Sequence, residues 1–438
     1  MSTEVVALLI LCVVVVLYVT EVIPLAVTTV LGCSALVWFQ CCKATVAFSG
    51  FTNYVTWLVI GMVMVGGALF ETGAADVIGR AIVRITGPSE KGLVLGMFPV
   101  VMLMSAFLNN SSTTATFLPI VQGVSASSGG KVRLKMLAMP LAFAATTGGM
   151  CTLVGSTPPL LVNGALENLG YAPFGFFEFA IIGVPICVLV LIYSLTVCPL
   201  MGERMWGKQI AEEQAALARE GTANVVVEQV AADAKQKGKM WTSGAILLLC
   251  VLGFTLQPSF SDYIDLGTIA ITGAMLTVVT RCIPTVKRLW ELTDWNTFFV
   301  LGGAIGFAKG LEVSGAGQLV ADTVLAWMGD ASPFIIWAVF CLVAVILTQM
   351  MSNTAACAMM APMGMFVAQG LGVDPLPWMM GLATATAAAY MTPVGTPPNT
   401  IVLMPGKYSF MDYVKLGGLF QLLSFIAVCI IVPIVWPF

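Results

Sequence analysis

The amino-acid sequence predicts an all-α, polytopic membrane protein that contains two inverted-topology repeats. Of its 438 residues, 59% are hydrophobic and only 9% are charged, whereas soluble domains carry roughly 25% charged residues. Several apolar runs approach the ~20 residues that a helix needs to cross a bilayer. The strand alternation typical of an outer-membrane barrel is absent. Similarity between the two halves of the chain is the third observation behind this fold class.

The repeat is visible in single residues and in longer stretches. Asn110 and Asn353 lie 243 residues apart, and so do Pro119 and Pro362. Two pairs of stretches also match: WLVIGMVMVGGALFETGAA at 57–75 with FVLGGAIGFAKGLEVSGAG at 299–317, and TLVGSTPP at 152–159 with TPVGTPPN at 392–399. Matched halves of about 200 residues each indicate one structural unit that is used twice.

The first repeat, residues 1–200, is divided into elements by its glycine, proline and charge clusters. We expect a re-entrant hairpin at about 92–126, because a straight helix would place the polar residues 109–114 near the middle of the bilayer. A hairpin tip buried in protein tolerates polar, irregular backbone. The other expected elements are spans at about 4–20, 23–40, 53–72 and 174–199, a surface helix at 73–90 and a broken helix at about 134–165.

The second repeat, residues 241–438, is expected to contain a hairpin at about 333–369 and a broken helix at about 377–404. Residues 201–240 are predicted to form a hydrophilic cytoplasmic linker, as a solvated helix. Each repeat has an odd number of crossings, about five, so the second repeat must be inverted. With both termini outside, the basic clusters obey the positive-inside rule: Arg80, Arg84, Lys91, Lys131, Arg133, Lys135, Arg204, Lys208, Lys235, Lys237, Lys239, Arg281, Lys287 and Arg288.

Composition excludes several classes of protein. The net charge is −3 without a basic stripe, so nucleic-acid binding has no electrostatic support. The chain has no histidine, which removes the usual zinc ligands and histidine-based triads. An intramembrane hydrolase would need paired aspartates, a metal site or an activated serine, and the spans offer none, so the chain is not predicted to be an enzyme. A passive channel needs an open pore, and two occluding hairpins argue against one.

The residues at the two hairpin tips suit a binding site for an anion and cations. Discontinuous helices at matched positions of inverted repeats are typical of secondary transporters with a site at the midplane. Asn110, Ser111, Asn353 and Thr354 offer donors to an oxyanion, while their oxygens and unwound carbonyls offer hard ligands to a small cation. Helix N-termini at the tips favour an anion. Neither tip contains Lys or Arg, so co-bound cations must cancel the charge of the anion.

At these residues the chain resembles the divalent anion/Na⁺ symporter family of the ion transporter superfamily, which includes citrate, dicarboxylate and sulfate carriers. That family carries a Ser-Asn-Thr motif at each hairpin tip. The second motif is complete at 352–354, whereas the first reads Asn-Asn-Ser at 109–111. TPVGTPPN resembles the second broken helix of the family. GGMCTLVGSTPPLLVNG at 148–164 resembles the first, with Pro159 where the family usually has Asn.

The resemblance implies two Na⁺ sites, one substrate site, a homodimer in the lipid bilayer and an elevator-type movement of a transport domain against a scaffold. The first Na⁺ site would use Ser105, Asn109, Asn110 and Gly155, and the second Thr348, Met351, Asn353 and Gly395. The substrate would contact Asn110, Ser111, Ser156, Thr157, Asn353, Thr354 and Thr396.

The resulting hypothesis is a secondary active transporter of the cell (inner) membrane that couples Na⁺ to symport of a divalent anion, with a C4-dicarboxylate as the first candidate. The alternative is a sulfate or citrate carrier of the same family, or an anion exchanger, because the sequence does not show the geometry of the substrate. Glu71 is interpreted as an interfacial group, and Lys309 with Glu312 as a structural pair or interfacial groups. A role of either acid in proton coupling is the weaker alternative.

Overall fold

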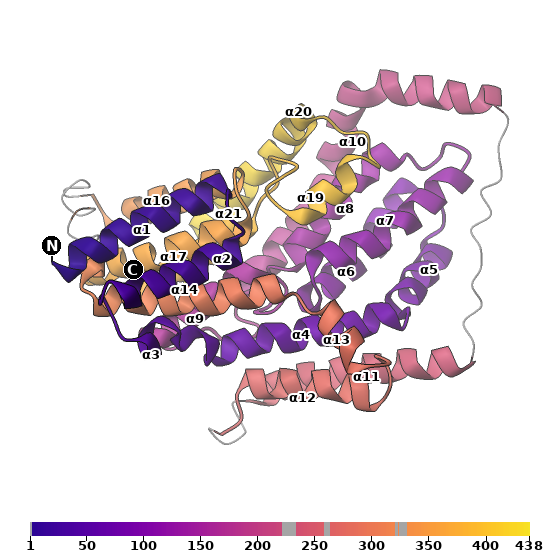
Figure 1. Ribbon diagram of the computed structural model, residues 1–438. Coiled ribbons are helices and arrows are strands. Elements are labelled where there is room, and N and C mark those ends of the chain that lie inside the picture. The colour runs from indigo at the N-terminus through magenta and orange to yellow at the C-terminus, as the bar shows by residue number, and fades with distance from the viewer. Residues whose placement is uncertain (1, 221–233, 258–262, 320–322, 324–330) are drawn as a thin grey trace.

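The computed structural model describes residues 2–220, 234–257, 263–319, 323 and 331–438, and within these ranges the chain forms helices and no β-strand (Figure 1). Seven of the described helices are long and apolar enough to cross a membrane, and further apolar helices of 10–17 residues accompany them. The prediction of an all-α, polytopic membrane protein is therefore confirmed.

The helices before the expected linker follow the predicted order. Their bounds are α1 Thr3–Thr20, α2 Leu25–Trp38, α3 Ala44–Ala47, the 3₁₀ turn η1 Ser49–Phe51, α4 Tyr54–Glu71, α5 Ala74–Thr86, α6 Glu90–Phe107, α7 Asn110–Ser127, α8 Leu134–Gly148, α9 Thr157–Asn168 and α10 Ala180–Glu220. The pair α6–α7 corresponds to the expected first hairpin, and α8 with α9 to the expected first broken helix.

The helices after the linker repeat these two features. Their bounds are α11 Ala234–Leu256, α12 Leu266–Val279, α13 Val286–Leu292, α14 Trp295–Val313, α16 Pro333–Thr348, α17 Asn353–Leu371, α18 Pro375–Ala387, α19 Pro397–Leu403, α20 Phe410–Asp412, the π-helical turn η3 Tyr413–Gly417 and α21 Gly418–Val435. Here α16–α17 is the hairpin, and α18 with α19 is the broken helix.

Small residues bring the outer helices close together. α12 packs against α4, and α14 packs against α2. A Cβ atom added to Gly61 would lie 2.5 Å from the carbonyl carbon of Ala270, so the two backbones touch. At the other contact the Cys33 thiol donates to the carbonyl of Gly303 at 3.1 Å. Because lipid supplies no hydrophobic driving force between helices, such close contacts supply the packing energy.

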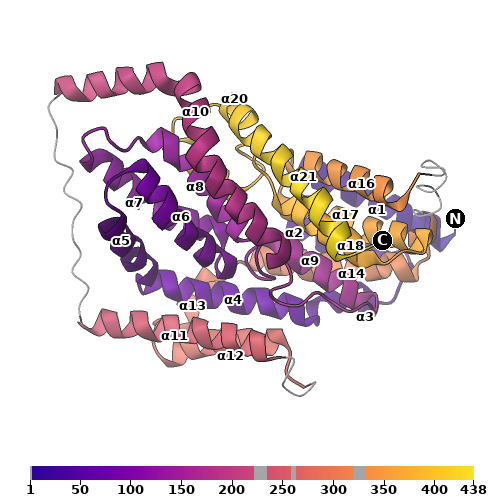
Figure 2. The ribbon, with the colours of Figure 1, turned by 180° about the vertical axis from the view of Figure 1, so that it is seen from behind.

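The two hairpins lie in different parts of the molecule (Figure 1). α6 packs on α8, and α16 packs on α18, so each hairpin lies beside the broken helix that follows it in the chain. On the rear face α10 and α21 lie side by side (Figure 2). There the Tyr193 hydroxyl donates to the Leu416 carbonyl at 2.6 Å.

The described first part of the expected linker is a continuation of α10. α10 continues without a break through residue 201 to Glu220, because the hydrophilic residues 201–220 are mostly good helix formers. Residues 221–233 of the expected linker, and the side chains of Arg80 and Lys235, lie outside the described part of the chain. The C-terminal end of α10 and the start of α11 lie at the end of the molecule opposite both termini (Figure 1).

Charged residues form clusters near the ends of the spans. Arg133, which precedes α8, contacts Glu90 at 2.8 Å and also pairs with Glu203 of α10. The hydrogen bond to Glu90 is the main cause of a raised pKa of the Arg133 guanidinium. Glu71, which was interpreted as an interfacial group, forms an ion pair with Arg288 at 2.9 Å. The predicted pair of Lys309 with Glu312 is confirmed at 2.8 Å.

The close contact between α4 and α12 leads to a prediction about the stability of the protein. We expect Gly61→Ala to lower the unfolding free energy by about 1–3 kcal/mol, because the added methyl group overpacks a backbone contact. Gly244→Ala in α11 is the matched control, since a Cβ there meets nothing within 4 Å and alanine favours a helix. Thermal melting of the detergent-purified protein checks both, and a Gly61→Ala variant that melts no earlier than wild type would contradict the packing.

Candidate functional site

Each hairpin turns at a residue that caps the following helix. The Asn109 side chain accepts a hydrogen bond from the Ser111 backbone N–H at 2.8 Å. The Ser352 side chain accepts one from the Ala355 N–H at 3.2 Å. Asn and Ser are both strong N-cap residues, so the departure from the family motif at Asn109 preserves the helix start. Asn110 and Asn353 consequently occupy the first helical position of α7 and α17.

Matched hydrogen bonds close the two tips. The Ser105 hydroxyl at the end of α6 donates to Asn110 Oδ1 at 2.6 Å. In the second hairpin the Thr348 hydroxyl lies 2.8 Å from Asn353 Oδ1 and 2.8 Å from the Thr386 carbonyl. Both hydroxyl residues are fully buried. Each tip therefore holds a hydroxyl oxygen and an amide oxygen together, two neutral oxygen ligands in a fixed arrangement.

Glycines let the unwound stretches of the broken helices approach these oxygens. A Cβ on Gly149 would lie 2.1 Å from Asn110 Oδ1, and a Cβ on Gly155 would lie 2.6 Å from the Gly149 carbonyl oxygen. In the second half, a Cβ on Gly395 would lie 2.9 Å from the carbonyl oxygen of Thr348. The unwound backbone thus comes close to hydroxyl, amide and carbonyl oxygens, which are the hard, neutral ligands that a small cation prefers.

The two halves of the chain meet through these same elements. α17 packs against α9 of the first half, and α7 packs against α19 of the second half. The Cys357 thiol, one turn into α17, donates to the Pro158 carbonyl at 3.6 Å. The hydroxyls of Thr147 and Tyr390, also 243 residues apart, form a hydrogen bond at 3.1 Å. Each hairpin therefore contacts the broken helix of the other half.

The remaining predicted site residues lie at the starts of the second segments of the broken helices. Ser156 and Thr396 precede α9 and α19 in extended conformation, and Thr157 begins α9. Ser156 Oγ is buried without a hydrogen-bond partner among the described residues, which is the state expected of a group that binds a ligand. Met351 is buried, and its backbone N–H donates to Leu347 at 3.0 Å. The half-buried Ser111 and Thr354 follow the two tip asparagines.

Two residues that the sequence did not mark as functional hold the unwound backbone of the second half in place. Gln349 accepts from the Met391 N–H at 2.9 Å through its side chain. The Asn399 amide donates to the carbonyls of Ala389 and Thr392 at 3.0 and 2.9 Å. The first half has Pro159 at the place of Asn399 and no such bridge. Asn399 is the last residue of the motif TPVGTPPN, but its hydrogen bonds to the unwound backbone are seen only in the structure.

A further hydrogen bond fixes the first broken helix to the first hairpin. The Thr152 hydroxyl donates to the carbonyl of Ala106 at the end of α6. Thr152 is buried. The contact ties the unwound stretch to the hairpin close to Ser105, and it explains how this half holds its irregular backbone without an equivalent of Asn399.

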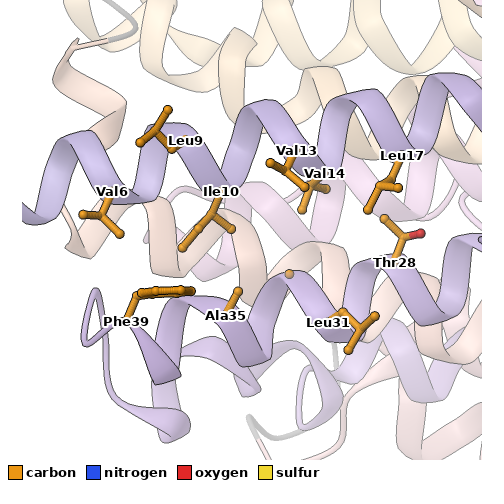
Figure 3. A pocket seen from close by; sticks show the side chains of 11 residues that line it. Val6, Leu9, Ile10, Val13, Val14, Leu17, Thr28, Leu31, Ala35 and Phe39 are labelled. Atoms are coloured by element: carbon orange, nitrogen blue, oxygen red, sulfur yellow. The ribbon is translucent and has the colours of Figure 1, made fainter.

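Two cavities differ sharply in chemistry. A groove of about 560 Å³ between α1 and α2 is lined almost entirely by aliphatic side chains (Figure 3), so it offers nothing to a charged ligand. A small cavity of about 50 Å³ contains four of the predicted site residues, and its lining is Val59, Met62, Val63, Phe107, Asn109, Val154, Gly155, Ser156, Thr157, Leu160, Asp294 and Thr297. Asp294 and Thr297, at the start of α14, were not predicted.

The tips hold no fixed positive charge. The ion pairs found among the described residues lie elsewhere, at Arg133, Arg288 and Lys309. The described residues also contain no group of three or more Asp, Glu, Cys or His side chains that could hold a metal ion. A cation at either tip would therefore be bound by neutral oxygens, and an anion by hydroxyls, amides and helix N-termini.

The hydrogen bonds of the Thr348 hydroxyl lead to a prediction about the stability of the protein. We expect Thr348→Val to lower the unfolding free energy by about 1–3 kcal/mol, because Asn353 Oδ1 and the Thr386 carbonyl lose their shared donor. Thr272→Val is the matched control, since that exposed hydroxyl bonds only the Thr268 carbonyl within α12 at 2.7 Å. Thermal melting without ligands measures both variants. Equal melting temperatures for wild type and Thr348→Val would show that this hydroxyl does not hold the second tip.

Comparison with known proteins places the chain among transporters. The citrate transporter family model matches residues 15–355 and again 259–438. The uncharacterized transporter YfbS of Escherichia coli is 24% identical, over 89% of this chain and 92% of that protein. The sodium-dependent dicarboxylate transporter SdcS of Staphylococcus saprophyticus is 25% identical, and SdcS of Staphylococcus aureus is 26% identical, each over 96% of this chain and 84% of the relative.

Solved structures show the same fold. The YdaH transporter of Alcanivorax borkumensis aligns with a TM-score of 0.62 at 15% identity, covering 90% of this chain and 88% of that one. MtrF of Neisseria gonorrhoeae aligns with a TM-score of 0.60 at 15% identity, covering 89% and 82%. The chain thus belongs to the citrate transporter family, as a multi-pass membrane transporter and not an enzyme, and its resemblance to the divalent anion/Na⁺ symporter family is confirmed.

Proposed function

We propose that the protein is a secondary active transporter that couples Na⁺ to the symport of a divalent anion, with a C4-dicarboxylate as the first candidate. The observation that carries this proposal is the matched pair of hydroxyl–amide contacts, Ser105 with Asn110 and Thr348 with Asn353. Each contact presents neutral oxygens next to a closely packed glycine of the unwound backbone, and each lies at the start of a helix whose positive dipole end favours an anion.

The charge balance of the tips explains why cations accompany the anion. Importing a dianion against an inside-negative potential costs about 2 × 2.3 kcal/mol per 100 mV. At least two Na⁺ ions cancel this cost, and a third makes import driven by the potential. Neutral ligands suit this task, because they bind cations tightly only when the anion is also present and leave no buried charge when the site is empty.

The ligands of the two Na⁺ ions and of the anion are assigned from the family resemblance. One Na⁺ binds among Ser105, Asn109, Asn110 and Gly155, and the other among Thr348, Met351, Asn353 and Gly395. The anion bridges both halves through Asn110, Ser111, Ser156, Thr157, Asn353, Thr354 and Thr396. The unpartnered Ser156 Oγ supports this assignment, and so does the contact of α17 with α9.

The comparisons favour two anions. The SdcS relatives are named sodium-dependent dicarboxylate transporters, which supports a C4-dicarboxylate and Na⁺. The matching family model is described as a citrate transporter, which makes citrate the second candidate. Both anions carry at least two carboxylates, so the same hydroxyl, amide and helix N-terminal donors serve either one.

We also propose how the chain is organised and moves. Residues 1–200 and 241–438 form the two inverted repeats, and both termini face outside, with the segment 201–240 in the cytoplasm of a cell (inner) membrane. The hairpins and broken helices form a transport domain that moves as an elevator against a scaffold that contains α4, α12, α2 and α14, within a homodimer. The position of both termini opposite the C-terminal end of α10 and the start of α11 supports the orientation (Figure 1).

Uptake into proteoliposomes tests the proposed function. Radiolabelled succinate should accumulate with an inward Na⁺ gradient and not with choline. Asn353→Ala should abolish this uptake, because it removes an amide that binds both a cation and the anion. Asn296→Ala is the matched control, since Asn296 is exposed on α14 and should transport like wild type. Unlabelled citrate and sulfate are added as competitors to rank the anions.

The controls separate the alternatives. Melting curves verify that each variant is folded before transport is compared. Succinate uptake of equal rate in Na⁺ and choline would contradict Na⁺ coupling and favour exchange. Competition by citrate that exceeds competition by succinate would move the substrate assignment to citrate. Full activity of Asn353→Ala would remove the second tip from the site.

A further inference from the structure

The small polar cavity lies between the first hairpin tip and helices outside the hairpins. Its lining includes Asn109 and residues 154–157 of the first broken helix. It also includes residues of α4 and the start of α14, which contributes Asp294 and Thr297. α9 packs against both α4 and α14, so these helices lie together beside the tip.

Asp294 is the only ionisable side chain in the lining of this cavity. It caps α14, because its carboxylate accepts from the Thr297 backbone N–H at 3.1 Å and from the Thr297 hydroxyl at 2.5 Å. Among the described residues no Lys or Arg forms an ion pair with it. A carboxylate oxygen has more than one lone pair, so Asp294 retains acceptor capacity toward the cavity.

The rest of the polar lining selects the kind of ligand. Asn109 is exposed at the tip, and Ser156 Oγ is buried without a partner. A carboxylate in the same lining attracts a cation. The volume of about 50 Å³ has room for a small ion, since a single water needs roughly 10–15 Å³ of such volume. The cavity therefore suits a small cation.

A second carboxylate lies at the other tip. Glu21 follows α1, and its Oε1 lies 3.5 Å from the backbone nitrogen of Ser352. Glu21 adopts a positive φ of 48°, a conformation that is uncommon for residues other than glycine. Each tip thus faces one acidic side chain from outside the hairpins, Asp294 at the first and Glu21 at the second.

We propose that Asp294, together with Glu21 at the second tip, attracts the coupling cation to the hairpin tips from the surrounding helices. This inference rests on the proposed Na⁺ coupling and adds two residues that the tip motifs do not contain. Asp294 acts through its charge at the edge of the first cation site, where the neutral ligands Asn109 and Gly155 hold the ion. The carboxylate raises the local concentration of cations and disfavours the dianion at this edge of the site.

Na⁺-dependent thermal stabilisation of the purified full-length protein in detergent tests the inference without transport. NaCl replaces choline chloride at constant ionic strength with succinate and citrate present throughout, and the half-saturating Na⁺ concentration is read from the melting temperature. Asp294→Asn should raise this concentration at least about fivefold, because one nearby charge is lost. Asparagine also caps helices, so melting in choline should not change. Glu21→Gln should act in the same direction.

Two variants separate charge from position. Asp294→Glu keeps the charge and should stay within about twofold of wild type, an energy difference of about 0.4 kcal/mol. Asp374→Asn is the matched control, since Asp374 caps α18 at 2.9 Å and does not line the cavity. It should not change the response to Na⁺. An equal shift for Asp294→Asn and Asp294→Glu would overturn the inference, because position and not charge would then matter.

The remaining outcomes distinguish this inference from the proposed function. If wild type responds to Na⁺ and Asp294→Asn responds identically, the role of Asp294 is overturned while Na⁺ coupling stands. If wild type melts at the same temperature in Na⁺ and choline, the proposed Na⁺ coupling is overturned, and the role of Asp294 is overturned with it.

Discussion

The structure depends on one constraint, which is that every buried backbone polar group in a membrane protein needs a partner. The chain leaves helical conformation at two hairpin tips and in two broken helices, and each exception is held by a side chain. Asn109 and Ser352 cap the helices that follow the tips. Gln349 and Asn399 bind the unwound backbone of the second half. The irregular backbone is therefore stable where it can contact a ligand.

The same constraint determines the electrostatics of the site. A fixed lysine or arginine at the tips would bury a charge whenever the anion was absent, at a high energetic cost. Neutral hydroxyl, amide and carbonyl oxygens avoid that cost, and they bind an anion well only together with cations. In the proposed function, coupling follows from charge balance, because the cations and the anion neutralise each other in the site. Acidic residues outside the hairpins, Asp294 and Glu21, add cation attraction without entering the tips.

Much of the fold could be predicted from the sequence, because hydropathy marks the spans and the 243-residue spacing of Asn110 and Asn353 marks the tips. The N-cap role of both motifs also follows from residue type. Other features required the structure. Asp294 lies 185 residues after Asn109 in the sequence. It comes close to the first tip because α14 packs on α9. The close approach of Gly149 to Asn110 is equally invisible, since glycines occur throughout the chain.

Equilibrium binding of the anion at varied Na⁺ concentration tests the central claim most directly. Radiolabelled succinate or citrate is titrated onto the purified protein while choline keeps the ionic strength constant. A site of neutral ligands whose charge is balanced by co-bound cations predicts no binding in choline. It also predicts an affinity that rises with at least the second power of the Na⁺ concentration. An anion that binds with equal affinity in Na⁺ and in choline would contradict the account.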